Sequence, residues 1–418
     1  MKIKVLLILF FCFLKTVYSQ QNSIELDEDV LSFIQGKDSL VDEVFKQQEK
    51  YKLQIIYGQT NHAGFDSVNV VNSKLSSVES YFYPASAIKL PCAILTMEKL
   101  NKLDIPNEHY FRIGDEFFCG NMSHVNNSNK YKSSYFDMIK VMLTVSDNAA
   151  YNSVYEFLTP RYITNQLMER NLKSINIYKR FAGCNVTENL KTNSIDFFNK
   201  DDNFLHRQEA SVMGLTEMAE KYKYTSAKLI GENHELNSTV LSKPYDFNYN
   251  IEASLFDLHH SLIRLVYPLT TFPELRWQIN KKNRNFILKY LGISPKELGQ
   301  SKYIDSKKYP DNLYKYIAIG EEDSLLNASV RTFSKLGLSY GFVTELAYVI
   351  DFEENIDFFL SISMYVNDNQ TVNDNQYEYE TIARPFCARL GMLLVDYEKL
   401  KGRNSNKDLS YFEKVLTN

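Results

Sequence analysis

The chain has 418 residues, 44% of them hydrophobic, and a formal net charge of −4 at pH 7. This length and apolar content suffice for one large globular domain or for two subdomains that share a core. The slightly acidic balance argues against nucleic acid as a partner.

The first nineteen residues have the features of a secretory signal peptide. Lys2 and Lys4 precede an apolar run over residues 5–14, and Val17-Tyr18-Ser19 offers small residues at the −3 and −1 positions. We therefore predict cleavage before Gln20 and a periplasmic or secreted protein. Cleavage removes three of the 47 basic residues and none of the 51 acidic ones, which makes the net charge −7. No later stretch is apolar over the roughly 18 residues of a membrane helix, so we expect no transmembrane anchor.

The predicted elements place strands near both ends of the mature chain and helices between them. In chain order they are a helical region over 22–50, strands over 52–59, 67–71 and 80–83, a helix over 85–100, a mainly helical region over 96–300 that includes 134–145, 151–172 and 210–224, strands over 339–351 and 357–366, and a closing helix over 377–400. This order indicates an α+β fold, in which an antiparallel sheet from both chain ends is flanked by helices and receives an inserted all-helical subdomain.

We expect residues 20–418 to form a single domain. Its α/β part would cover about 20–95 and 325–418, and its helical part about 96–324. An insertion over about 225–320 has no role that the sequence indicates.

Four cysteines remain after the signal: Cys92, Cys119, Cys184 and Cys387. An oxidising compartment permits disulfides, and four cysteines allow three pairings, while unpaired buried thiols are an equal alternative. No two cysteines have zinc spacing, and the seven histidines form no His-Glu-x-x-His pattern. We expect neither a metal site nor a cofactor.

The stretch Ser86-Ala-Ile-Lys89 opens the helix predicted over 85–100. A spacing of three places both side chains on one helix face. Burial lowers the pKa of a lysine, and a neutral lysine beside a hydroxyl can accept its proton. The alternative is a serine near the helix N-cap followed by a solvated lysine.

Two further stretches are ordinary alone and informative together. Ser146-Asp147-Asn148 follows the helix over 134–145, and Lys335-Leu336-Gly337 opens a late strand that a hairpin and the closing helix follow. Each of these motifs by itself is typical of a turn or of the start of a strand. The order of the three motifs is specific, because the chain has no second Ser-x-x-Lys and no second Ser-Asp-Asn.

In these motifs the sequence resembles the class A β-lactamase and penicillin-binding serine hydrolase superfamily, over nearly all of the mature chain. "Tyr-Pro-Ala-Ser-Ala-Ile-Lys-Leu-Pro" is similar to its nucleophile helix, and "Lys-Leu-Gly" is similar to its third motif with one change. The resemblance implies the β-lactamase and DD-peptidase fold. It also implies that Ser86 is the acylated nucleophile, that Lys89 is its base and that Ser146 relays a proton to the leaving nitrogen.

The resemblance further implies how a substrate would be held. Asn148 would hold its side-chain amide, and Lys335 would attract its carboxylate. The backbone N–H groups of Ser86 and Leu338, which follows Gly337, would form the oxyanion hole.

The sequence departs from the family in two places. Leu336 stands where the family has threonine or serine, which predicts weaker carboxylate recognition unless Ser339 replaces the hydroxyl. The Glu-x-x-Leu-Asn signature of the deacylating glutamate is absent. Glu188 is the nearest substitute, with Asp196 and Glu209 as weaker ones, and all three also read as ordinary surface acids.

The leading functional hypothesis is an exported serine hydrolase of the class A β-lactamase type, acylated on Ser86 by β-lactams or related amides. The runner-up is a D-alanyl-D-alanine carboxypeptidase or transpeptidase, or a penicillin-binding protein that does not hydrolyse its ligand. We expect a small β-lactam or peptidoglycan-derived substrate and a monomeric protein.

Overall fold

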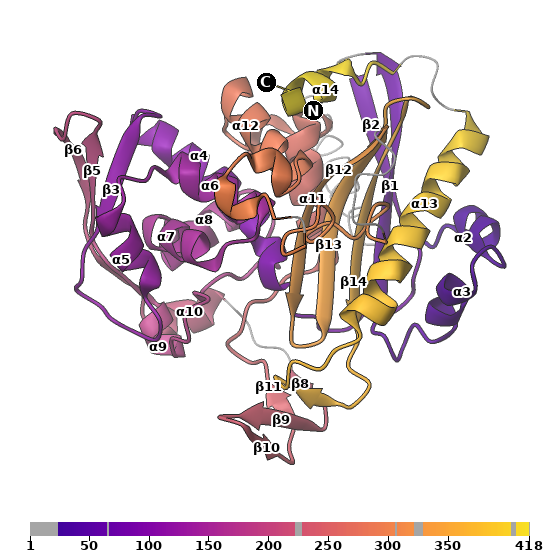
Figure 1. The fold of residues 1–418 in the computed structure, drawn as a ribbon, viewed down its shortest axis with the longest axis horizontal. Helices are drawn as coiled ribbons and strands as arrows, with labels where there is room; N and C mark the ends of the chain where they lie inside the picture. The colour runs from indigo at the N-terminus through magenta and orange to yellow at the C-terminus, as the bar shows by residue number, and fades with distance from the viewer. Residues whose placement is uncertain are drawn as a thin grey trace, which may run out of the picture.

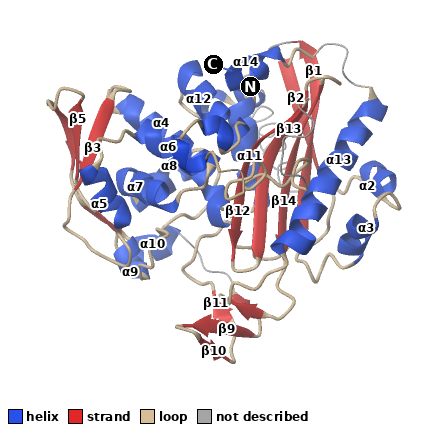
Figure 2. Ribbon diagram, viewed as in Figure 1, coloured by secondary structure: helices blue, strands red, loops and turns tan. Residues whose placement is uncertain are grey.

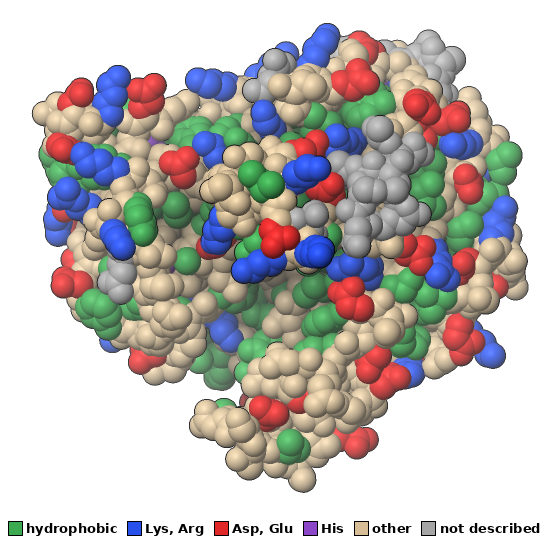
Figure 3. All heavy atoms as spheres, viewed as in Figure 1, with side chains coloured by type: hydrophobic (Ala, Val, Ile, Leu, Met, Phe, Trp, Pro, Cys, Tyr) green, Lys and Arg blue, Asp and Glu red, His purple; other side chains and the backbone are tan. Residues whose placement is uncertain are grey.

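The computed structural model describes residues 24–64, 67–221, 228–305, 307–321, 329–402 and 407–417. The predicted signal peptide lies outside these residues. No helix in the described ranges combines the length and the apolar character that crossing a membrane requires. On the face shown in Figure 3, basic and acidic side chains are interspersed, as the small net charge leads one to expect.

A five-stranded antiparallel sheet built from both ends of the chain forms the centre of the fold (Figure 1). Its strand order is β12-β13-β14-β1-β2. The strands are β1 (Gln54–Gly64), β2 (Ser67–Lys74), β12 (Val330–Ser339), β13 (Phe342–Asp351) and β14 (Ile356–Tyr365). The fold class predicted from the sequence is confirmed in this respect.

Thirteen helices flank this sheet or form the part inserted into it, counting only the described residues. They are α2 (Glu28–Ile34), α3 (Ser39–Lys46), α4 (Lys89–Lys102), α5 (Ser123–Lys130), α6 (Tyr135–Thr144), α7 (Asn148–Leu158), α8 (Pro160–Glu169), α9 (Val186–Asn189), α10 (Leu215–Lys221), α11 (Leu255–Val266), α12 (Lys281–Gly292), α13 (Arg384–Lys401) and α14 (Ser410–Thr417). Short 3₁₀ turns occur at η2 (Ala85–Ile88), η3 (Pro268–Thr270), η4 (Pro273–Leu275), η5 (Lys296–Leu298) and η6 (Ser301–Tyr303), and a π-turn, η7 (Tyr379–Ala383), leads into α13.

Every residue of β13 and β14 is buried, because helices cover both faces of the sheet (Figure 2). On one face, side chains such as Phe333, Tyr348 and Phe359 pack in the core that includes α11 and α12. On the other, residues such as Val343 and Leu360 pack against α13, α2 and α3. Strands buried on both faces read as continuous apolar runs, which explains the composition of 342–365.

Several predicted element boundaries were wrong, among them that of the helix predicted over 210–224, which begins only at Leu215 because Ser211–Val212 form a strand. Residues 80–83 form no strand. The strand predicted to start at Ser339 is two strands, because Tyr340 and Gly341 both have positive φ (56° and 82°) and make a two-residue hairpin loop. The helix predicted over 151–172 is broken at Thr159, which caps the next helix just before Pro160.

The middle of the chain is mainly helical, as predicted, but it is not all-helical. Short strands there form small sheets: β3 (His109–Ile113) with β5 (Ile195–Asn199) and β6 (Phe204–Gln208), and β4 (Lys191–Thr192) with β7 (Ser211–Val212). The predicted insertion supplies β8 (Leu229–Ile230), β9 (Asn233–Leu236), β10 (Thr239–Leu241) and β11 (Tyr245–Asp246), and β9 also pairs with β15 (Thr371–Val372). Strands of two to five residues carry too little alternation to be recognised in a sequence.

Candidate active site

Ser86 lies in the sharp turn that leads into α4. Ala85 before it has φ +45°, a left-handed conformation that costs energy for a residue with a side chain. From Phe82 to Leu90, Ser86 alone is partly exposed, and its neighbours are buried. Among the described residues, its hydroxyl has no hydrogen-bond partner. The turn therefore presents one free hydroxyl at the end of a buried helix.

Lys89 is buried, and its ammonium is held by the Ser146 turn. Its Nζ donates to the carbonyl oxygen of Ser146 at 2.6 Å, to Oδ1 of Asn148 at 2.7 Å and to Oγ of Ser146 at 3.3 Å. Burial holds its pKa well below the ordinary lysine value, and the nearby charge of Lys335 lowers the pKa further. A lysine with a lowered pKa gives up its proton more readily, and the neutral amine can then accept one.

Ser146 links two helices through a strained turn. It follows α6 with φ +57°, and the next residue, Asp147, caps α7 by accepting from the N–H of Ala150 at 2.8 Å. Asn148 is the first residue of α7 and is exposed. The capping bond fixes the turn, so that Ser146 Oγ stands between two lysines.

Lys335 reaches the same hydroxyl from the sheet. Its Nζ donates to Oγ of Ser146 at 3.0 Å and to the carbonyl oxygen of Leu336 at 2.7 Å. Burial and the neighbouring Lys315 lower the pKa of Lys335 to about 7. Residues far apart in the sequence thus form one chain of hydrogen bonds, from Lys89 through Ser146 to Lys335.

Gly337 brings the outer edge of β12 against the turn that holds Ser86. A Cβ added at this glycine would lie 2.7 Å from the backbone nitrogen of Ser86 and 2.8 Å from that of Ala87. Only a glycine permits this approach. Since β12 is an edge strand, this side of it has no partner strand.

The N–H of Leu338 faces the same edge. The carbonyl of Leu336 points away from β13, since it accepts from Lys335. In an antiparallel strand, the N–H and C=O of a residue point the same way, and alternate residues share that direction. The N–H of Leu338 therefore points toward the Ser86 turn, as an oxyanion hole would require.

The side chains of β12 separate onto two faces. Leu336 is only 2% exposed and packs in the core behind the sheet, and the side chain of Leu338 packs against the same core. Ser339 is partly exposed and shares the face of Lys335 and Gly337 by strand alternation. Leu336 thus packs in the core and supplies no hydroxyl to the site. Ser339 is the residue of this strand that offers a hydroxyl on the side of Lys335.

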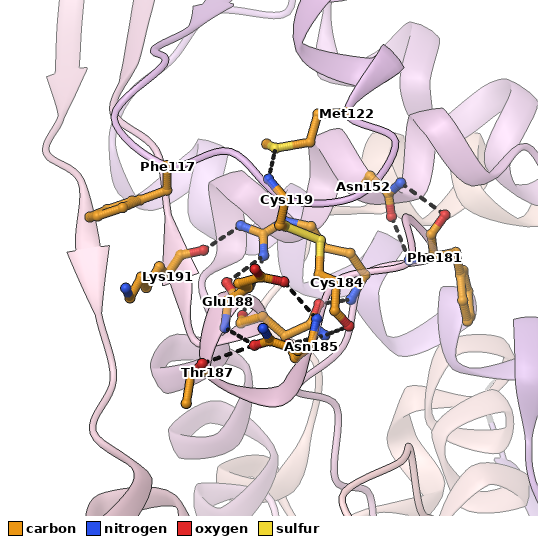
Figure 4. The surroundings of a disulfide bond; sticks show 12 residues. Phe117, Cys119, Met122, Asn152, Phe181, Cys184, Asn185, Thr187, Glu188 and Lys191 are labelled. Carbon is orange, nitrogen blue, oxygen red and sulfur yellow. Dashed lines mark hydrogen bonds between the residues drawn. A yellow bond between two sulfur atoms is a disulfide. The ribbon is translucent and has the colours of Figure 1, made fainter.

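The side chain of Glu188 is engaged elsewhere in the structure and not at Lys89 (Figure 4). Its Oε2 accepts from the N–H of Asn185 at 2.7 Å, which completes a capping box at the short helix α9, and the carboxylate lies beside a disulfide. The weaker candidates are also engaged, because Asp196 and Glu209 both pair with Arg207, at 2.9 and 3.3 Å. This geometry gives none of the three carboxylates a contact with Lys89.

The disulfide joins Cys119 to Cys184, one of the pairings that the sequence left open, while Cys92 and Cys387 are buried free thiols. With Glu188, the bonded pair is the one group within the described ranges that has metal-ligand proximity. Its sulfur atoms are bonded to each other and supply no thiolate, so this group does not fit a metal.

Sequence reasoning missed the aromatic surroundings of Lys89. The ring centroids of Phe181 and Tyr151 lie 5.3 and 5.8 Å from its Nζ. Asn152 holds Phe181 in place by accepting from its N–H at 2.8 Å and donating to its C=O at 3.3 Å (Figure 4). No motif in the sequence marks Phe181, because its position depends on a loop fastened by side-chain amides and by the disulfide.

A buried ion network supports this loop. Nε of Arg180 donates to Oε1 of Glu156 at 2.9 Å, and the same carboxylate bonds His124 at 3.2 Å and the N–H of Asn193 at 2.8 Å. The positive charge of Arg180 and these hydrogen bonds hold the pKa of Glu156 below its usual value despite burial. The network fixes the loop that carries Phe181 from its other side.

Comparison with known proteins supports the motif assignment. Residues 58–228 match the model of a family described as the β-lactamase enzyme family. Over this stretch, the chain is similar to the β-lactamase enzyme family. The family segment contains Ser86, Lys89, Ser146 and Asn148, whereas Lys335 lies beyond its end and joins the site only through the fold.

Solved structures of β-lactamases are similar to this chain at low identity. A β-lactamase from Burkholderia ambifaria is 10% identical, with 86% of this chain and 98% of that chain covered and a TM-score of 0.48. A β-lactamase from Desulfarculus baarsii is 11% identical, with 89% and 98% covered and a TM-score of 0.47. A search of curated proteins found no match.

Proposed function

We propose that the protein is a serine hydrolase that forms an ester between Ser86 and the carbonyl of a β-lactam or related amide, and that it releases this ester slowly. The observation that carries the proposal is the hydrogen-bonded chain Lys89–Ser146–Lys335, together with the partly exposed Ser86 three residues before Lys89. The family match over residues 58–228 by itself supports only the coarser statement of a β-lactamase-type protein.

Acylation would use the groups of this chain in turn. Neutral Lys89 takes the proton of the Ser86 hydroxyl as Oγ attacks the amide carbonyl. When the C–N bond breaks, Ser146 Oγ passes its proton to the leaving nitrogen and recovers one from Lys89. While it is charged, Lys335 would keep the Ser146 hydroxyl oriented, since an ammonium can only donate to that oxygen.

Substrate binding would use the edge of β12 and the start of α7. The N–H groups of Ser86 and Leu338 would together stabilise the carbonyl oxygen as it gains charge, which the close approach of Gly337 to the Ser86 nitrogen supports. Charged Lys335 would attract a substrate carboxylate, with Ser339 two residues beyond Gly337 on the same strand face. Oδ1 of Asn148 is occupied by Lys89, which leaves its amide N–H groups for a substrate carbonyl.

Slow release follows from what surrounds Lys89. Hydrolysis of the ester needs a base that can deprotonate a water molecule. Lys89 has aromatic rings beside it, and no hydrogen bond joins it to a carboxylate in the described ranges. The nearest motif acid, Asp147, is engaged in capping α7. The same observation favours the second candidate, a D-alanyl-D-alanine carboxypeptidase or transpeptidase, or a penicillin-binding protein that β-lactams acylate without being destroyed.

Covalent labelling tests the proposal. Intact-mass analysis after treatment with benzylpenicillin should show one adduct, which Ser86→Ala should lack. An adduct that persists in that variant would refute the role of Ser86. Following the adduct with time then separates the two candidates, because the proposed hydrolase slowly regenerates free enzyme and releases hydrolysed penicillin, whereas a penicillin-binding protein that does not hydrolyse its ligand keeps the adduct.

Export as a monomer to the periplasm or the medium, after cleavage before Gln20, is part of the same proposal. N-terminal sequencing and light scattering of the secreted protein test it. A mature protein that retains residues 1–19 would contradict the export step.

A further inference from the structure

A second cavity lies apart from Ser86, where the hairpin of β1 and β2 meets the ends of α11, α12 and α14. Its volume is about 350 Å³, within the range of small-molecule sites. None of the proposed catalytic or substrate-binding residues lines it. Nothing in the proposed reaction uses this space.

The walls of the cavity are mostly apolar, with two cations at one side. Val68, Val266 and Phe412 contribute apolar surface, and Lys281 and Arg284 project from the first turn of α12. A largely apolar space with a few charged groups at one side is the usual composition of a site for a small organic molecule.

The two cations have little to neutralise them. Within the described ranges, neither Lys281 nor Arg284 forms an ion pair. Nη2 of Arg284 donates to the Tyr411 hydroxyl at 3.1 Å, and its buried Nε has no partner among the described residues. Asp408 also lines the cavity, and its carboxylate, which accepts from the N–H of Ser410 at 3.1 Å, offsets one of the two positive charges and leaves the lining with a net positive charge.

The negative charge of Asp357, which lies behind the inner wall of the cavity, is balanced by its neighbours. Asp357 is fully buried and pairs with Lys407 at 2.6 Å and with His62 at 3.1 Å. It also accepts from the hydroxyls of Tyr267 and Tyr348, both at 2.9 Å. These partners satisfy its charge, so the cavity keeps the positive character of Lys281 and Arg284.

We propose that this cavity binds a small organic anion with a flat apolar body and a carboxylate. The carboxylate would lie between Lys281 and Arg284, where the guanidinium offers N–H donors that suit a charge-assisted hydrogen bond to a carboxylate. The apolar body would fill the space between Val68 and Phe412.

Calorimetric titration with naphthalene-2-carboxylate tests the proposal, with the neutral naphthalene-2-carboxamide as the matched ligand. The acid should bind at least tenfold more tightly than the amide, since the two differ in charge and not in shape. Arg284→Gln and Lys281→Gln should each weaken binding of the acid about tenfold. Lys282→Gln should not, because that exposed lysine is adjacent and does not line the cavity.

Two more variants locate the ligand. Val68→Trp should abolish binding by filling the cavity, and its thermal melting shows whether the fold is kept. Lys335→Met should leave binding unchanged, because the active-site cation plays no part. The proposal is overturned if the acid does not bind, if the amide binds as tightly, if the charge variants of α12 have no effect, or if Lys335→Met abolishes binding.

Discussion

Replacing Gly337 by alanine should separate the two parts that form the oxyanion hole. The new Cβ would lie 2.7 Å from the nitrogen of Ser86, and ordinary van der Waals contact begins near 3.4 Å. The carbonyl oxygen of Pro84 would lie closer still, at 2.4 Å, so the edge of β12 must retreat from the Ser86 turn by about 1 Å. Both atoms belong to backbone inside a packed core, so no flexible side chain can absorb this movement.

The movement should affect acylation more than stability. Misplacing one oxyanion donor costs about 3 kcal/mol of transition-state stabilisation, or about 10²-fold in rate. Overpacking of a core costs about 1–3 kcal/mol of folding free energy. The assay is the second-order rate of benzylpenicillin adduct formation by mass spectrometry, combined with thermal melting.

Gly214→Ala is the matched control. No atom lies within 4 Å of the Cβ that this change would add, and its φ is not in the left-handed region. The control should acylate and melt like the unchanged protein. If Gly337→Ala acylates within threefold of the unchanged protein, the inferred approach of β12 to Ser86 is refuted.

Lys89→Ala should slow acylation by about 10²-fold or more, as the loss of a general base does, and an unchanged rate of adduct formation would exclude that role. Acylation by carboxylate-bearing lactams should fall as the pH rises through about 7, because Lys335 then loses its charge, whereas a lactam ester should show no such fall; identical pH profiles for acid and ester would contradict this. Stopped-flow nitrocefin hydrolysis should show a burst equal to the enzyme concentration and then turnover below the ordinary range of about 1–10³ s⁻¹, and Glu188→Gln should leave the slow phase unchanged; fast turnover that collapses in this variant would identify Glu188 as the base. Leu336→Thr should lower the free energy of unfolding by about 2 kcal/mol in urea titrations without faster acylation, because the side chain is packed in the core. Removing the disulfide with Cys119→Ser should cost up to about 4 kcal/mol, since the bond closes a loop between residues 65 apart, whereas Cys387→Ala should show only the smaller cost of a buried cavity.

The sequence alone determined the strands at the two chain ends, the helix that follows Ser86 and the three polar motifs. These features depend on local periodicity and on short spacings, both of which can be read from the sequence without knowledge of the fold. For the cysteines, the sequence left the three disulfide pairings and the free thiols as open alternatives, since pairing depends on distance in space and not on spacing along the chain.

Only the tertiary structure decided what these residues do to one another. The low pKa of Lys89 requires complete burial, and that burial is supplied by α7 and the loop of Phe181. The register of β12 places the side chain of Lys335 beside Ser146 and that of Leu336 in the core on the other face of the sheet. A slip of one residue in the register would exchange these two faces. Among the described residues, Lys89 contacts no carboxylate, and the cavity beside α12 is charged. Both features arise from segments that are distant in sequence, because packing in three dimensions, not spacing along the chain, fixes which groups share an environment.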